Sequence, residues 1–296
     1  TTEIYTLSLH DALPISPDGS AGPPRPDTYE RADQTVPIID AAGKARALYD
    51  ARRDRVQIKP FTDDDPTLGM ADGYAVQKEL VALLLADGDS IVGYKVGLTS
   101  KPMQRMIGVD SPDFAPILGS TVHVDGGTVS MSGLIQPKME AEVIAVMGER
   151  LAGPGVLVTD AARAVAGVCA SVEIVDSRFE DWRIKLADTV ADLASNGAFA
   201  VSSRIVPLTE VDPRYVGMTL TRNGELIDTG AGAAALGDPL AVVAWLANVL
   251  DENGIALEPG HLVMTGALHA AVPMAAGDVF RADFDRLGPV TLRVVE

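Results

Sequence analysis

The chain has 296 residues, which allows two domains of about 150 residues each or one large domain with an appendage. Its 41 acidic side chains outnumber 24 lysines and arginines, giving a formal net charge of -17. This balance excludes nucleic acid and anionic membranes as expected partners, because both require clustered positive charge. The single cysteine, Cys169, cannot form an intramolecular disulfide, and no apolar run reaches the roughly 18 residues of a membrane span. We therefore expect a cytoplasmic protein.

The first 16 residues do not read as a targeting signal, because they contain no Lys or Arg and acidic side chains interrupt their apolar positions. Back-translation of residues 1–16 spells a common sequencing-library adapter. We expect this segment to be translated adapter and not native sequence; the alternative is a genuine N-terminal arm. Residues 17–37 are rich in Pro, Gly and charge, so we expect a flexible lead-in.

Residues 38–115 are predicted to form a helical N-terminal part. Apolar side chains recur at spacings of three and four in residues 41–55 and 71–86, and this periodicity predicts two amphipathic helices.

Residues 116–296 are predicted to form a β-rich catalytic core. Asn223-Gly224 is a strong signal for a type I′ hairpin. Asp238 and Pro239 predict the start of one helix, and Gly254 its end. The expected fold class is α+β, helical at the start and then mixed or antiparallel. Strands are predicted at residues 91–96, 121–131, 140–147, 168–175, 198–201, 218–221, 262–265, 279–284 and 290–295.

Three carboxylates stand out in the predicted strands. Glu140 and Glu142 are two residues apart, so both leave the same face of their strand. Glu173 lies alone in the apolar run VCASVEIV, where an unpaired carboxylate is costly. Three carboxylates from two strands would suit a hard cation such as Mg²⁺ or Mn²⁺. Two alternatives stay open. Glu140 and Glu142 would lie at a solvated strand end, or Glu173 would form an ion pair with Arg178.

Two further residues are candidates for proton transfer. Lys95 lies between Tyr94 and Val96 in a predicted strand, and apolar surroundings would lower its pKa, although nearby carboxylates would raise it. The alternative is a surface lysine at a strand end. Asp113 follows Ser-Pro, a turn signature, so composition alone predicts a loop there.

The motifs GYKVGLTS, GVDSPDF, QPKMEAEV, EIVDSRFEDWRI, DTVADLAS and GAGAAALGDPL occur in this order between residues 93 and 240. Their order and spacing resemble the 2-keto-4-pentenoate (2-hydroxypenta-2,4-dienoate) hydratases of the fumarylacetoacetase superfamily. The resemblance covers the chain from about residue 42 to residue 296. It implies a fumarylacetoacetase C-terminal-like fold, a Mg²⁺ or Mn²⁺ ion held by Glu140, Glu142 and Glu173, and a catalytic role for Lys95 with Asp113 nearby.

The resemblance also implies a reaction and partners. A small anionic 2-hydroxy-2,4-dienoate would gain water at C4 to give a 4-hydroxy-2-oxo acid, as in the catabolism of aromatic compounds after meta-cleavage. We expect the substrate to contact Thr99, Gln136, Ser195 and Thr265. Members of this family tend to be homo-oligomers, and the aldolase that acts next on the product is a candidate partner.

The sequence departs from the family pattern at one position that bears on specificity. Leu193 stands where the family usually has Asn, so specificity is affected if that side chain faces the pocket. Three rival functions remain: a 4-oxalocrotonate decarboxylase, a hydratase of longer 2-oxo-3-enoates, and an inactive partner-binding paralogue. Gln136 and the DWRI run favour the hydratase over the decarboxylase, since decarboxylases tend to have His before the Pro-Lys.

Overall fold

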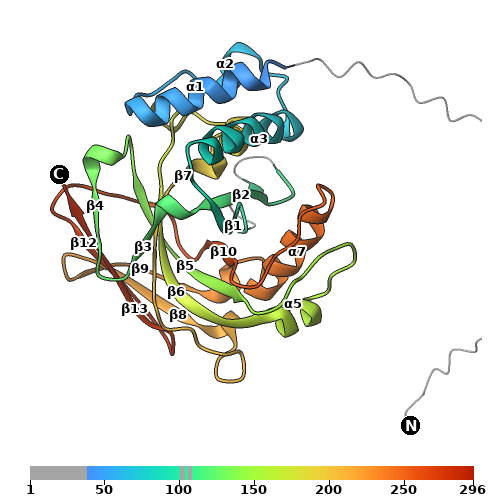
Figure 1. The fold of residues 1–296 in the computed structure, drawn as a ribbon. Helices are drawn as coiled ribbons and strands as arrows, with labels where there is room; N and C mark the ends of the chain where they lie inside the picture. The colour runs from blue at the N-terminus through green and yellow to red at the C-terminus, as the bar shows by residue number, and fades with distance from the viewer. Residues whose placement is uncertain (1–38, 101–103, 106–108) are drawn as a thin grey trace, which may run out of the picture. The chain divides into compact units, whose positions relative to one another are not determined.

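The computed structural model describes residues 39–100, 104–105 and 109–296 (Figure 1). The predicted adapter and lead-in segments lie outside the described residues. Residues 39–296 form one compact unit.

Three helices precede the first strand, and two of them are the helices predicted from periodicity. They are α1 (Ala41–Asp54), α2 (Phe61–Asp64) and α3 (Met70–Ala86). The Asp40 side chain begins α1 by accepting a hydrogen bond from Gly43 N at 2.8 Å. These helices gather at one end of the molecule, where α1 and α3 pack together and α3 packs on α6 (Leu186–Ala191) (Figure 1).

The larger sheet has eight strands and carries the candidate carboxylates. Seven of them follow the order β2-β1-β10-β5-β6-β7-β3, and β11 also pairs with β5. The pairs β1–β10 and β3–β7 are parallel and the others antiparallel, so the predicted mixed sheet is confirmed. The strands are β1 (Ile91–Gly97), β2 (Asp113–Leu118), β3 (Val122–Val124), β5 (Lys138–Met147), β6 (Val165–Val175), β7 (Asn196–Val201), β10 (Leu262–Ala267) and β11 (Val272–Pro273).

The smaller sheet has five strands in the order β4-β13-β12-β8-β9. The predicted hairpin is confirmed: it joins β8 to β9 through Asn223 and Gly224, whose φ values of 56° and 85° suit a type I′ turn. The strands are β4 (Thr128–Ser130), β8 (Gly217–Arg222), β9 (Glu225–Ala231), β12 (Val279–Phe284) and β13 (Gly288–Val295).

Two predictions of local structure were wrong, one of a strand and one of a loop. Residues 121–131 do not form one strand, because the turn at Gly126 separates β3 in the larger sheet from β4 in the smaller one. The segment after Ser111-Pro112 is not a loop but the buried strand β2, which begins at Asp113 and pairs with β1. The boundary expected after residue 115 therefore falls inside β2.

One core packs the two sheets and helix α7 (Pro239–Asp251) together. The helix begins as predicted: Asp238 accepts a hydrogen bond from Leu240 N at 2.9 Å, and Pro239 occupies the first position. It ends at Asp251, three residues before the predicted Gly254. The short helix α5 (Val158–Ala164) packs on α7. The core includes Ala141, Val143 and Ala145 of β5, Phe280 and Ala282 of β12, Val290 and Leu292 of β13, and Val243 and Leu246 of α7.

One described stretch, Gly232–Asp251, is long and apolar enough to cross a membrane by length and composition alone. Half of it is buried within the fold. Its helical part α7 has 13 residues, fewer than the about 20 that span a bilayer, and it packs on β5 and β10. The structure thus uses it as a core helix.

Candidate active site

The structure brings three carboxylates together on one face of the larger sheet. Glu140 and Glu142 extend from β5, and Glu173 extends from the neighbouring strand β6 as the direct cross-strand partner of Glu140. One oxygen from each carboxylate lies within 4.8 Å of the other two. Glu142 and Glu173 are buried and Glu140 is half-buried, so the solvated strand end considered above does not describe this site.

Burial and the neighbouring carboxylates disfavour the ionised forms of Glu140 and Glu142 in the metal-free protein. Burial, reinforced by the charge of Glu173, raises the pKa of Glu140 to about 7. Burial, Glu173 and Glu140 together raise the pKa of Glu142 well above its ordinary value. One backbone donor offsets this effect: Gly266 N donates a hydrogen bond to Glu142 Oε2 at 2.9 Å.

Lys95 lies against the carboxylates and not at the surface. Its ammonium forms an ion pair with Glu173 and donates a hydrogen bond to the Ala194 carbonyl oxygen at 2.8 Å. Burial by itself lowers the pKa of Lys95, but Glu173, and then Glu142 and Glu140, raise it, and the net shift is upward. In the metal-free protein Lys95 is therefore a charged ammonium.

Arg178 does not pair with Glu173, so that alternative is wrong. It forms a buried ion pair with Asp192 at 2.6 Å and lies 3.8 Å from Asp176. The same guanidinium donates to the Asn196 carbonyl oxygen at 2.8 Å. Arg178 thus stabilises the turn that follows α6, and Glu173 forms its ion pair with Lys95 instead.

Asp113 lies beside Lys95 as the first residue of β2. Its carboxylate lies over Gly97, where an added Cβ would stand 2.2 Å from Asp113 Oδ1, so a larger residue there would displace this carboxylate. Burial raises the pKa of Asp113 to about 6, while the charge of Lys95 lowers it. Oδ1 is buried and has no hydrogen-bond partner among the described residues. It is therefore a buried acceptor available to a bound molecule.

A strained turn holds the carbonyl that fixes Lys95. Leu193, Ala194 and Ser195 all have positive φ, at 54°, 50° and 56°, a conformation that costs about 1–2 kcal/mol for each such residue. The Leu193 side chain is buried among apolar residues of α1 and α3, including Leu48 and Leu80. Leu193 therefore belongs to the apolar cluster at the helical end.

The four residues expected to contact substrate differ in their present hydrogen bonds. Thr99 lies against Gly266, where a Cβ would meet its Oγ1 at 1.9 Å. Thr265 Oγ1 donates to the Val143 carbonyl oxygen at 2.8 Å. Gln136 Nε2 donates to the carbonyl oxygens of two residues that follow β6, and Ser195 Oγ lies 3.4 Å from Thr189 Oγ1.

Sequence reasoning missed two residues near the carboxylates. Ser171 is the cross-strand partner of Glu142, and its buried Oγ has no hydrogen-bond partner in the described part of the chain. The alternation of β6, which places Ser171 and Glu173 on one face, could have indicated it. His269 accepts a hydrogen bond from Ala141 N at 2.8 Å, and nothing in its sequence surroundings predicts that contact.

The residues present fit a hard divalent cation. Oxygen atoms make up the cluster, which suits Mg²⁺ or Mn²⁺. Like charges directly opposite each other on paired strands are destabilising. Among the described residues, the ion pair between Lys95 and Glu173 is the only one that any of the three carboxylates forms. A bound cation would balance the remaining charge, and its water ligands could satisfy the Ser171 hydroxyl.

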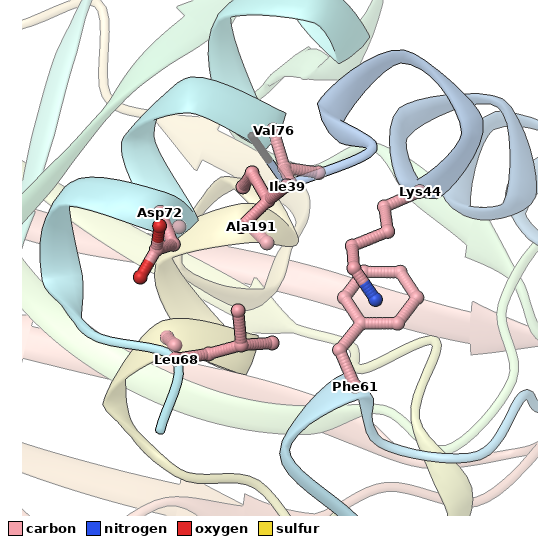
Figure 2. A pocket seen from close by; sticks show the side chains of 9 residues that line it. Ile39, Lys44, Phe61, Leu68, Asp72, Val76 and Ala191 are labelled. Atoms are coloured by element: carbon pink, nitrogen blue, oxygen red, sulfur yellow. The ribbon is translucent and has the colours of Figure 1, made fainter. Parts of the chain in front are cut away.

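A separate small pocket opens at the helical end (Figure 2). Side chains from α1, α2, α3 and α6 line it, and the Lys44 ammonium lies 4.4 Å from the centre of the Phe61 ring. It contains none of the three carboxylates, so it is distinct from the candidate site.

The fold and the carboxylate cluster define a β-rich protein with a candidate divalent-metal site. Residues 95–295 match the model of the fumarylacetoacetate (FAA) hydrolase C-terminal family. The chain belongs to this family, and the family expected from the motifs is confirmed.

Several similar proteins have names that describe their activity. The chain is 37% identical over 255 residues to a 2-hydroxyhexa-2,4-dienoate hydratase of Comamonas testosteroni, covering 86% of this chain and 97% of the relative. It is 39% identical over 246 residues to a 2-keto-4-pentenoate hydratase of Paraburkholderia xenovorans, covering 83% and 91%.

A similar solved structure is a 4-oxalocrotonate decarboxylase from Pseudomonas putida G7 complexed with magnesium and adipate. It has a TM-score of 0.84 and 39% identity, and covers 86% of this chain and 97% of that one. A second structure of that decarboxylase contains calcium and acetate.

Proposed function

We propose that this chain is a divalent-metal-dependent hydratase that converts a 2-hydroxy-2,4-dienoate, such as 2-hydroxypenta-2,4-dienoate, to the 4-hydroxy-2-oxo acid. The observation that carries the proposal is the convergence of Glu140, Glu142 and Glu173 beside Lys95. The hydratase names of similar proteins and the magnesium in the similar decarboxylase structure support it.

Glu140, Glu142 and Glu173 would hold the Mg²⁺ or Mn²⁺ ion. When bound, such an ion polarises substrate oxygens and stabilises the negative charge that develops on them. The reaction also requires the chain to move protons. The 2-hydroxyl loses a proton and C5 gains one; then the oxygen of water bonds to C4 and a proton adds to C3.

Lys95 and Asp113 are the proposed proton-transfer residues. An ammonium has three N–H donors. Lys95 uses two of them, for Glu173 and for the Ala194 carbonyl oxygen, which leaves one for substrate. Asp113 has a pKa of about 6, so near neutral pH it can accept a proton and return it. Thr99, Gln136, Ser195 and Thr265 are proposed to contact the substrate.

The test follows the ultraviolet absorbance of 2-hydroxypenta-2,4-dienoate with chelator-stripped protein, before and after Mg²⁺ or Mn²⁺ is added. We expect metal-dependent gain of one water by mass, lost in Glu142→Gln. Glu149→Gln changes an exposed glutamate just beyond β5 and serves as the matched control. Turnover that persists unchanged in Glu142→Gln would contradict the proposal.

Decarboxylation is the second candidate, because the similar structure with a TM-score of 0.84 is a 4-oxalocrotonate decarboxylase. The two reactions differ in their products. Release of CO₂ from 4-oxalocrotonate without hydration of the dienoate would assign the same carboxylates and Lys95 to that reaction instead.

We further propose a cytoplasmic homo-oligomer, with the aldolase that acts next on the product as a partner. Half-buried apolar side chains on the larger sheet support an oligomer: Val92, Val122, Val146, Val201 and Leu262. Light scattering coupled to size-exclusion chromatography tests it, and a monomer at micromolar concentration would contradict it.

A further inference from the structure

The ladder between β10 and β5 contains an irregularity beside the carboxylates. Met264 pairs with Ile144, but the next partners are Ala267 and Glu142, so β10 carries one extra residue. A bulge of this kind frees backbone groups from the regular ladder. Gly266, at φ +103°, uses its freed N–H to bind Glu142 Oε2.

The bulge changes the partners of Ala141, which lies between Glu140 and Glu142. In an antiparallel strand the N–H and C=O of one residue point to the same side, so both groups of Ala141 face β10 and the segment after it. Leu268 N satisfies the carbonyl of Ala141 at 3.0 Å. No backbone carbonyl among the described residues accepts the Ala141 N–H; His269 Nε2 accepts it instead at 2.8 Å.

The imidazole is built into this position. Its side chain is 1% exposed, and Nδ1 lies 2.6 Å from the Ala270 carbonyl oxygen. Since Nε2 accepts a hydrogen bond, the ring is neutral and its proton is on Nδ1, which donates to Ala270. Burial lowers the pKa of His269, which favours the same neutral form.

We infer that His269 is a positioning residue for the metal site: its Nε2 takes the place of a strand carbonyl and holds Ala141, and with it the flanking Glu140 and Glu142, at the bulge. The inference rests on the proposed function, because it takes these carboxylates as metal ligands. Ala141 is fully buried, so without this acceptor its N–H would lose its only hydrogen bond within the described structure.

Three substitutions separate the acceptor from the bulk of the ring. His269→Gln places an amide oxygen near the position of Nε2, His269→Asn reaches only as far as Nδ1, and His269→Leu has no acceptor. Mn²⁺ affinity is measured by the electron paramagnetic resonance of free Mn²⁺. We expect about tenfold weaker binding in the Leu and Asn variants and recovery to within about threefold in the Gln variant.

A second measurement requires neither metal nor turnover. The ¹⁵N shifts of histidine rings in the full chain, treated with chelator, report which nitrogen carries the proton. We expect the signals of a neutral ring protonated on Nδ1 for His269, and we expect these signals to be absent from the spectrum of His269→Gln. His261 is an internal reference, because its Nδ1 accepts from Glu258 N at 3.1 Å and its proton is therefore on Nε2.

The outcomes separate this inference from the proposed function. If wild-type protein binds Mn²⁺ no more tightly than His269→Leu, the positioning role alone is overturned. The same holds if His269→Gln binds Mn²⁺ as weakly as His269→Asn. A His269 ring protonated on Nε2 also overturns it. Wild-type protein that binds no Mn²⁺ overturns the proposed metal site, and the inference with it. If the Leu variant does not fold, the Asn and Gln pair decides.

Discussion

Glu140 on β5 and Glu173 on β6 are direct cross-strand partners, two carboxylates facing each other across a buried antiparallel pair. Glu142 lies on the same face, and Lys95 supplies the ion pair to Glu173. The repulsion between these carboxylates destabilises the metal-free protein, and the effect on its stability can be measured.

The stability of the metal-free protein should fall as the pH rises. In the folded state the pKa of Glu140 is about 7 and that of Asp113 about 6, above the roughly 4 of an unfolded carboxyl. Folding therefore takes up protons, so this contribution is fully present below about pH 4 and is lost as the pH rises to about 7.

Thermal unfolding in chelator tests this expectation. We expect the Tm to fall by at least about 4 °C between about pH 5 and pH 8. Added Mg²⁺ should raise the Tm more at the higher pH, where the carboxylates are ionised. A chelated protein that becomes steadily more stable over this range would contradict the prediction.

Lys95→Met should separate turnover from folding. The substitution leaves Glu173 without its ion pair, which destabilises the metal-free protein by about 3–5 kcal/mol. Turnover should fall at least about 100-fold because the proton donor is lost. Added Mg²⁺ should restore stability but not turnover. The control is Lys78→Met, an exposed lysine on α3, which should change neither. Full activity of Lys95→Met would exclude the proposed role.

Leu193→Asn should change stability and leave the choice of substrate unaltered. Asn tolerates the positive φ of this position better than Leu, but its amide would be buried among apolar side chains of α1 and α3. We expect a net loss of about 1–3 kcal/mol in urea unfolding. The kcat/KM ratio for dienoates of two chain lengths should stay within about threefold; a larger change would place this side chain in the pocket.

Ser171→Ala should respond differently with and without metal. The buried hydroxyl has no partner among the described residues, so its removal should stabilise the metal-free protein by about 1 kcal/mol. With Mg²⁺ bound, water on the ion would satisfy the hydroxyl, so the gain in Tm from Mg²⁺ should be smaller in the variant. Ser203→Ala, at an exposed position, is the control. Equal gains in variant and wild type would refute this account of Ser171.

Local patterns in the sequence predicted several features of the fold and part of the site. The period of two along β5 places Glu140 and Glu142 on one face, and Asp238-Pro239 and Asn223-Gly224 mark a helix start and a hairpin through their own backbone preferences. These features depend on neighbours within a few residues, so a single sequence is sufficient to predict them.

Tertiary structure decided what depends on distant residues. Asp113 follows a turn signature, yet pairing with β1 makes it the first residue of a buried strand. Arg178 lies close to Glu173 in sequence but pairs with Asp192. The register between β5 and β6 sets Glu173 opposite Glu140, and the β10 bulge gives His269 its contact with Ala141. Register and bulges arise from the packing of whole strands, and local sequence does not encode that packing.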